Sequence, residues 1–248
     1  MRDPLICGAR THIGLVRPNN EDSFATLSKD GGFPCAFILA DGMGGHRRGD
    51  LASRIAVDYV RERLLQELAN IKSISDLTRQ LADIVEKANV KVYLGSLTSE
   101  QNRGMGTTLT LAVLLPDQIL IAHVGDCRAW LFRDDELRQL TVDHTLVQEL
   151  VNSGSLTTEE TYLHPRRNVL TRALGVPEYL QPDILVIPTQ PGDRFLISSD
   201  GLHGLVDAQA MRSAIKKEKT PDELVDSLIN LALEAGGEDN ITVLAAFL

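Results

Sequence analysis

The chain has 248 residues with a formal net charge of −9, and hydrophobic residues make up 43% of it. This length allows one large domain or two small ones with a sizeable core, and the acidic balance argues against nucleic acid or an anionic membrane as a partner. No apolar run approaches the roughly 20 residues that span a bilayer, and the first residues lack the apolar region of a signal peptide. The three cysteines are far apart in the sequence and form neither a disulfide framework nor a zinc pattern, so we expect a reducing, cytoplasmic setting.

The first half of the chain predicts strands followed by a pair of helices. We expect strands over 5–13, 24–27 and 36–40, and helices over 51–68 and from Asp76 onward. The apolar run 36–40 is typical of a buried strand, and it stops at Asp41, before a glycine-rich turn. Because Gly42 has no side chain, its carbonyl can approach an ion that Asp41 also binds. A turn with an aspartate that only caps the next helix is the alternative.

The second half predicts short strands joined by tight turns, which indicate an antiparallel sheet. We expect strands over 109–115, 118–124, 128–133, 136–140, 193–198 and 241–248, and helices over 145–152, 208–217 and 221–235. The polar stretch 141–180 is typical of a surface excursion that contacts substrate. The longer helices come in pairs, which favours layered α+β packing in a single domain, 1–248.

Acidic residues recur where apolar strands meet turns. These junctions contain Glu21 and Asp22, Asp41, Asp126, Asp200, and Asp239. Carboxylates that gather at one edge of a sheet cannot all stay ionised without cations. Hard divalent metals prefer oxygen ligands, so Mg²⁺ or Mn²⁺ is expected, and two such ions about 3.5–4 Å apart can activate water for attack on phosphorus. Arg17 offers a fork for a phosphate oxyanion, with a surface ion pair as the alternative.

The ordered set of motifs resembles the bacterial members of the metal-dependent PPM/PP2C-type serine/threonine phosphatases over essentially the whole chain. The motifs lie at residues 17–22, 40–46, 104–108, 123–126, 199–201 and 239–242. The resemblance implies a four-layer α/β/β/α sandwich, in which two mainly antiparallel sheets lie between helix pairs. It also implies that 141–180 is the flap of this family.

The resemblance assigns roles to individual residues. Asp41 corresponds to the ligand that bridges two core metals, with the Gly42 carbonyl on one of them, and Asp200 and Asp239 to further carboxylate ligands of the first metal. Glu21 and Asp22 match positions that hold metal or metal-bound water. Asp126, with Asp200, matches the site of a third, weaker metal. Arg17 matches the phosphate-binding arginine, and His46 a histidine proposed as general acid, with a solvated loop histidine as the alternative.

The implied activity is hydrolysis of phosphoserine and phosphothreonine in proteins by a metal-bridged hydroxide. The implied partners are phosphorylated proteins, including a serine/threonine kinase whose signalling the enzyme opposes, and we expect a monomer. No serine or cysteine nucleophile is required, so Ser199 needs no nucleophilic role. Cys127 is interpreted as a small packed residue, with a redox role as the alternative. The alternatives are a pseudophosphatase without turnover, a regulator of anti-sigma-factor antagonists, and a small-molecule phosphoesterase.

Overall fold

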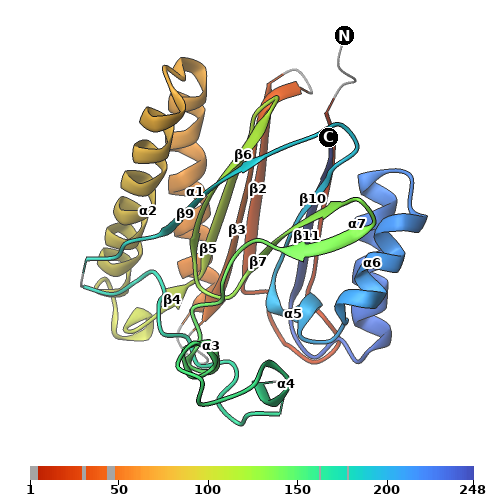
Figure 1. Ribbon diagram of the computed structural model, residues 1–248. Coiled ribbons are helices and arrows are strands. Elements are labelled where there is room, and N and C mark those ends of the chain that lie inside the picture. Colours follow the sequence, from red (N-terminus) through yellow and green to blue (C-terminus); the bar gives the residue numbers. More distant parts are fainter. Residues whose placement is uncertain (1–4, 30–31, 44–47, 162, 178) are drawn as a thin grey trace.

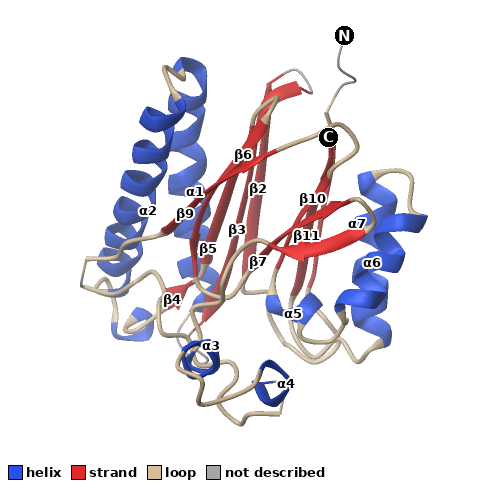
Figure 2. Ribbon diagram, viewed as in Figure 1, coloured by secondary structure: helices blue, strands red, loops and turns tan. Residues whose placement is uncertain are grey.

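The computed structural model describes residues 5–29, 32–43, 48–161, 163–177 and 179–248. These residues form four layers: two β-sheets pack face to face, and a pair of helices covers the outer side of each sheet (Figure 1 and Figure 2). Each strand pairing found among the described residues is antiparallel. The predicted α+β sandwich is therefore confirmed. None of the described helices combines the length and apolarity needed to cross a membrane.

Sheet A contains the first and last strands of the chain. Its order is β1 (Ile6–His12), β11 (Ile241–Phe247), β10 (Arg194–Ser198), β7 (Arg128–Arg133) and β8 (Glu136–Gln139). The turn between β7 and β8 is formed by Asp134 and Asp135, which both have positive φ, 50° and 67°. Aspartate tolerates this left-handed conformation, which matches the twist of a two-residue hairpin.

Sheet B is built around β3. Its order is β2 (Asp22–Lys29), β3 (Gly32–Met43), β5 (Leu109–Leu114), β6 (Gln118–Val124) and β9 (Asp183–Pro188), and the short β4 (Gly106–Thr107) pairs with the end of β3. The sequence analysis did not predict β9, although its residues 184–187 form a short apolar run. This strand lies at the edge of sheet B, and none of its residues is fully buried.

Helices cover the two outer faces. α1 (Gly49–Glu67) and α2 (Ile74–Ser96) pack on sheet B, and α6 (Ala208–Lys217) and α7 (Pro221–Glu234) pack on sheet A (Figure 1). α7 begins with the predicted capping box, in which Thr220 and Glu223 satisfy each other's backbone amides. For α2 the prediction was wrong by three residues: its N-cap is Ser73, which accepts a hydrogen bond from the Asp76 amide.

Aliphatic side chains fill the space between the layers. One cluster lies between the sheets, and two others lie between each sheet and its helices. Phe37 of β3 and Phe195 of β10 stack across the inter-sheet layer with ring centroids 6.3 Å apart, and both are fully buried. Burying a side chain of this size contributes roughly 1.5–3 kcal/mol. The core thus fixes the distance between the sheets, and with it the distance between groups that each sheet carries at its edge.

The predicted excursion 141–180 lies at one end of the sandwich. It contains α3 (Leu146–Asn152) and α4 (Thr158–Thr161), which stand together at the bottom of Figure 1. Its stem is closed by a bridge between Thr145 and Leu170 and by a hydrogen bond from the Leu146 amide to the Val169 carbonyl. We call residues 145–170 the flap segment. At the same end lie the start of β2, the end of β3 and the end of β6.

Candidate active site

Asp41 does not lie at the end of its strand, as the sequence predicted, but within it. β3 continues to Met43, and Asp41 pairs with Asp22 of β2. The extension is held by β4 and by Thr108, whose side-chain oxygen accepts a hydrogen bond from the Asp41 amide at 2.9 Å. The Thr108 amide and the Thr107 hydroxyl both donate to the Asp41 carbonyl. The backbone on both sides of this carboxylate is therefore fixed.

Gly42 is required by the approach of a helix. A Cβ atom at this position would lie 2.1 Å from the Gly49 carbonyl oxygen, at the start of α1, and 2.8 Å from the Glu21 carbonyl oxygen. No side chain fits such a gap, so the close packing of β3 against α1 explains the glycine. The same packing brings Glu21 beside the strand end, because the Gly42 amide donates to the Glu21 carbonyl.

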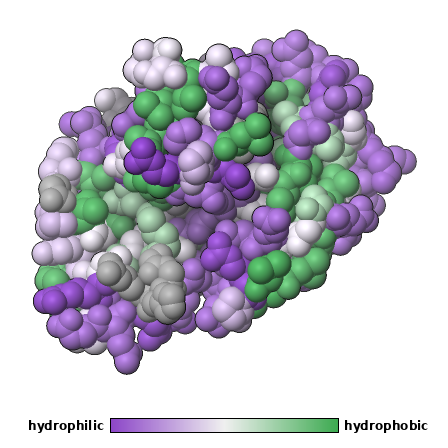
Figure 3. All heavy atoms as spheres, turned by 90° about the horizontal axis from the view of Figure 1, so that it is seen from below, coloured by the Kyte–Doolittle hydropathy of each residue, from purple (hydrophilic) through white to green (hydrophobic). Residues whose placement is uncertain are grey.

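Carboxylates from both sheets share one pocket of about 200 Å³. Sheet B and its loops contribute Glu21, Asp41 and Asp126, and the strand ends of sheet A contribute Asp200 and Asp239. Asp22 lies directly beside them, buried under Asp41. The structure thus brings together the predicted acidic residues; His46 lies outside the described residues. Seen from this end, the surface is hollowed and mostly hydrophilic (Figure 3).

Asp22 connects the two sheets. Its Oδ2 accepts hydrogen bonds from the Ser199 hydroxyl at 2.9 Å and the Thr242 hydroxyl at 2.6 Å, and both donors belong to sheet A or its turns. Its Oδ1 is buried without a hydrogen-bond partner among the described residues, and the same holds for Oδ1 of Asp200. A buried carboxylate oxygen without a donor costs free energy that a cation would recover.

The electrostatics of the pocket favour protonated carboxyls in the absence of cations. Burial, followed by the other carboxylates, raises the pKa of Asp22 to about 7 and that of Asp200 to about 6. Burial and neighbouring aspartates also hold the pKa values of Asp41 and Asp126 well above their ordinary value. Burial raises the pKa of Glu21 as well. Such a set of oxygen donors suits a hard divalent cation.

The described side chains do not close on a single point. No group of three or more His, Cys, Asp or Glu among the described residues is arranged to ligate one ion directly. One of the carboxylates, Asp239, is already paired, since the guanidinium of Arg17 donates to its Oδ2 at 2.6 Å. The carboxylates instead surround a cavity, which leaves space for water between a cation and the protein, as Mg²⁺ commonly requires.

Neither candidate nucleophile of ordinary hydrolases is available. Cys127 is fully buried, and burial, followed by Asp41 and Asp126, holds the pKa of its thiol well above the ordinary value. A protonated, inaccessible thiol does not attack a substrate. Ser199 is also fully buried and donates its hydroxyl to Asp22. The burial of Cys127 agrees with its interpretation as a packed residue, and the burial of Ser199 agrees with the expectation that it has no nucleophilic role.

Sequence reasoning missed the residues that hold the carboxylates in place. Asn240 donates to the Ile13 and Asn19 carbonyls and accepts from the Glu21 amide, so one side chain fixes the loop that carries Arg17 and Glu21. Thr108 and Thr242 play corresponding parts for Asp41 and Asp22. All three lie in the motifs on which the resemblance to the phosphatase family rests. That resemblance was the only feature of the sequence that could have pointed to them.

The sequence model of the protein phosphatase 2C family matches residues 11–236. The chain belongs to the protein phosphatase 2C family. Among curated proteins it is 40% identical, over 95% of its length and 92% of the relative, to the serine/threonine phosphatase Stp of Listeria monocytogenes.

Two solved structures of this family show the same fold. The serine/threonine phosphatase PstP/Ppp of Mycobacterium tuberculosis is 36% identical, with a TM-score of 0.86 and 98% of both chains covered. The catalytic domain of PstP in complex with two manganese ions is 35% identical, with a TM-score of 0.83 and coverage of 98% of this chain and 97% of that one. This protein phosphatase 2C is therefore a metal-dependent serine/threonine phosphatase.

Metal binding to this phosphatase is expected to depend on pH in a defined direction. The metal-free folded state holds protons on Asp22 and its neighbours that the unfolded chain releases near pH 4, so its stability falls as pH rises through the folded pKa values. Between about pH 5 and 7 the stabilisation by Mg²⁺ should therefore increase, by about 1.4 kcal/mol per pH unit for each proton displaced. Thermal unfolding with Mg²⁺ and with EDTA, compared at each pH, measures this. A Mg²⁺ effect that shrinks over this range would contradict it.

Proposed function

We propose that residues 1–248 form a single catalytic domain that removes phosphate from phosphoserine and phosphothreonine in proteins. The observation that carries this proposal is the pocket in which carboxylates from two sheets and Arg17 meet. The residues fit two divalent cations: Asp41 and the Gly42 carbonyl, Asp200 and Asp239 would hold them, and Glu21 and Asp22 would hold their water. Asp126 with Asp200 would hold a third, weaker ion, and Mn²⁺ and Mg²⁺ both suit these donors.

When bound, the cations supply Lewis acidity, which activates a water and neutralises the phosphoryl oxygens. The chain's own groups do the rest. Arg17 lies 46% exposed at the pocket, paired with Asp239, and its planar fork can exchange this partner for a phosphate oxyanion. Asp41 and Asp22 stay fixed by the hydroxyls of Thr108, Ser199 and Thr242, so the charge in the pocket does not move when substrate binds. His46 remains the candidate for protonating the leaving oxygen.

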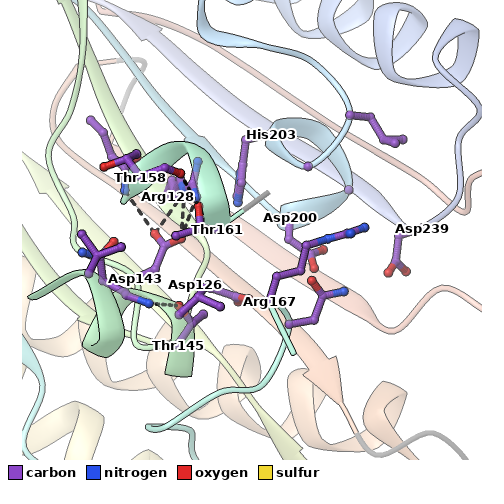
Figure 4. A pocket seen from close by; sticks show the side chains of 18 of the residues that line it. Asp126, Arg128, Asp143, Thr145, Thr158, Thr161, Arg167, Asp200, His203 and Asp239 are labelled. Carbon is purple, nitrogen blue, oxygen red and sulfur yellow. Dashed lines mark hydrogen bonds and ion pairs between the residues drawn. The ribbon is translucent and has the colours of Figure 1, made fainter. Parts of the chain in front are cut away.

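A protein substrate is favoured by the surface beside the pocket. A second cavity, of about 370 Å³, adjoins the first at Asp126, Asp200 and Asp239 and extends between the flap segment and α5 (Asp200–His203). Figure 4 shows Thr158 and Thr161 of the flap on one side of it and Asp200 and Asp239 on the other. Free phosphoserine is too small to occupy both cavities, but residues flanking a phosphorylated side chain can reach the second. A partner kinase, a cytoplasmic location and a monomeric state are part of this proposal.

The substrate class is tested by comparing phosphate release from a phosphoserine peptide and from free phosphoserine, with Mn²⁺, with Mg²⁺ and with EDTA. We expect metal-dependent release with a clearly higher kcat/KM for the peptide. Equal values for both substrates would favour a small-molecule phosphoesterase. Absence of turnover with either metal, in a folded protein, would favour a pseudophosphatase.

Arg167→Ala is expected to change peptide turnover more than turnover of a small aryl phosphate. Arg167 lies on the flap segment and lines the second cavity near Asp126 and Asp200 (Figure 4). Its loss should raise KM for a phosphopeptide several-fold and leave hydrolysis of p-nitrophenyl phosphate nearly unchanged, because the small aryl ester does not need the second cavity, which Arg167 lines. Arg61→Ala, at an exposed site of α1, is the matched control. Equal losses on both substrates would refute this role.

A further inference from the structure

The turn that carries Asp126 is unusually constrained. Gly125 follows β6 with φ of +111°, and a Cβ atom there would lie 2.5 Å from the side chain of Thr108. The turn is therefore pressed against the residue that also holds the Asp41 amide. Asp126 comes next, and its carboxylate lines both cavities of the site. A small shift of this turn would move that carboxylate relative to Asp200, whose charge contributes to the raised pKa of Asp126.

One residue, His144, binds both polar backbone atoms of Gly125. The His144 amide donates to the Gly125 carbonyl at 2.8 Å, and the Gly125 amide donates to Nδ1 of the His144 ring at 3.0 Å. Both residues are buried, and His144 is only 3% exposed. Water therefore cannot replace the ring as acceptor. If the ring were removed, the buried Gly125 amide would lose its hydrogen-bond partner, and the turn would move to satisfy it.

The ring of His144 is itself held in one tautomer. Because Nδ1 accepts from Gly125, the proton lies on Nε2, which faces Oδ2 of Asp183 at 3.1 Å. The other oxygen of Asp183 accepts from Arg172 at 2.7 Å. The ring also packs against the ring of His123, tilted by 43° with the centroids 4.8 Å apart. A carboxylate thus orients the imidazole, and the imidazole orients the turn.

His144 also stands where the flap segment begins. Its carbonyl accepts from the Thr171 amide, and Thr145, the next residue, caps α3 and pairs with Leu170. The residue therefore joins three parts of the chain: the turn of Asp126, the stem of the flap and, through Asp183, the edge strand β9.

We propose that His144 is a positioning residue, which holds the Gly125–Asp126 turn so that the Asp126 carboxylate binds a divalent cation together with Asp200. This rests on the proposed function, in which Asp126 is a ligand of the weakest cation. Partners of this kind, which orient a ligand without touching the metal, commonly contribute 10–100-fold to metal affinity.

The test measures Mn²⁺ binding at pH 7.5 by titration with electron paramagnetic resonance detection. Circular dichroism is used to compare variants at the same folded fraction. The amide of His144→Asn places an acceptor near the position of Nδ1, whereas the amide of His144→Gln reaches toward the position of Nε2. We expect His144→Gln to weaken the weakest Mn²⁺ site about 10–100-fold. We expect His144→Asn to stay within about threefold of wild type, because it keeps the acceptor for the Gly125 amide.

Two further variants separate the possible failures. Asp126→Asn should remove the weakest site; if it does not, Asp126 is no ligand and the proposed site assignment fails, independently of His144. The side chain of Asp183 is 40% exposed, so the substitution Asp183→Asn leaves the core intact. It allows the ring to present Nδ1–H to the Gly125 amide, so it should weaken the same site several-fold. Unchanged Mn²⁺ affinity in Asp183→Asn and in folded His144→Gln, beside a loss in Asp126→Asn, would overturn the positioning role.

Discussion

Asp41→Asn is expected to lower metal-dependent hydrolysis of p-nitrophenyl phosphate by more than about 100-fold, since even partners outside the ligand shell of a metal contribute 10–100-fold. The substitution keeps the shape of the side chain and its fixed backbone, which Thr107 and Thr108 hold. It removes only the negative charge at the centre of the carboxylate cluster. Steady-state kinetics with Mn²⁺, with Mg²⁺ and with EDTA measure the loss.

The same substitution should make the metal-free protein more stable. Burial and four neighbouring aspartates oppose the charge of Asp41, so a neutral amide relieves repulsion in the folded state. In EDTA at pH 8 we expect a higher Tm for Asp41→Asn than for wild type. The increase in Tm that Mn²⁺ gives over EDTA should be smaller for Asp41→Asn than for wild type. Asp58→Asn, at an exposed site of α1, is the control. Turnover that survives Asp41→Asn would contradict the whole site, and a lower Tm in EDTA would contradict the electrostatic account.

Arg17→Ala is expected to raise KM for p-nitrophenyl phosphate by roughly 10–100-fold, the range that loss of one hydrogen bond to a charged group gives. The guanidinium lies in the pocket and pairs with Asp239. In the proposed function it would contact the phosphoryl group of bound substrate and of the transition state alike. An interaction that is equal in both states changes KM more than kcat. Competitive inhibition by inorganic phosphate should weaken in parallel.

Arg10→Ala provides a matched control for Arg17→Ala. Arg10 lies on β1 with 47% of its side chain exposed, much as Arg17 does, and it pairs with Asp222 and Asp226 of α7 instead of a pocket residue. We expect its removal to leave KM unchanged, because exposed ion pairs contribute little. A large loss of kcat in Arg17→Ala at unchanged KM would mean that Arg17 acts mainly on the transition state.

Periodicity in the buried strands and paired helices predicted layered α+β packing, and the resemblance to the phosphatase family implied the four-layer sandwich. The strands 118–124 and 128–133 and the helix 208–217 were predicted to the residue. The edge strand β9 was missed, and so was the one-turn helix α5, which begins at Asp200. Both are short, with six residues in β9 and four in α5. Local pattern is too weak a signal for elements that tertiary contacts stabilise.

The acidic residues of the site could be predicted, but the way they are held could not. Aspartates at strand junctions are visible in the sequence, and ordered motifs identify the family. The hydrogen bond between Asp22 and Thr242, by contrast, joins residues 220 positions apart, and that between Asn240 and the Glu21 amide spans 219. No local spacing in the sequence predicts such pairs, because they form only when one sheet packs on the other.

The sharing of the site between two sheets has a consequence for what a shortened chain can do. Asp239 and the strand β11 that follows it lie far along the chain from Glu21 and Asp22. β11 lies inside sheet A, between β1 and β10, so sheet A is incomplete without this strand. A chain cut before Asp239 has most of the carboxylates but no common pocket for them. The proposed metal site therefore depends on the folding of the whole domain, and removal of this one strand is expected to abolish it.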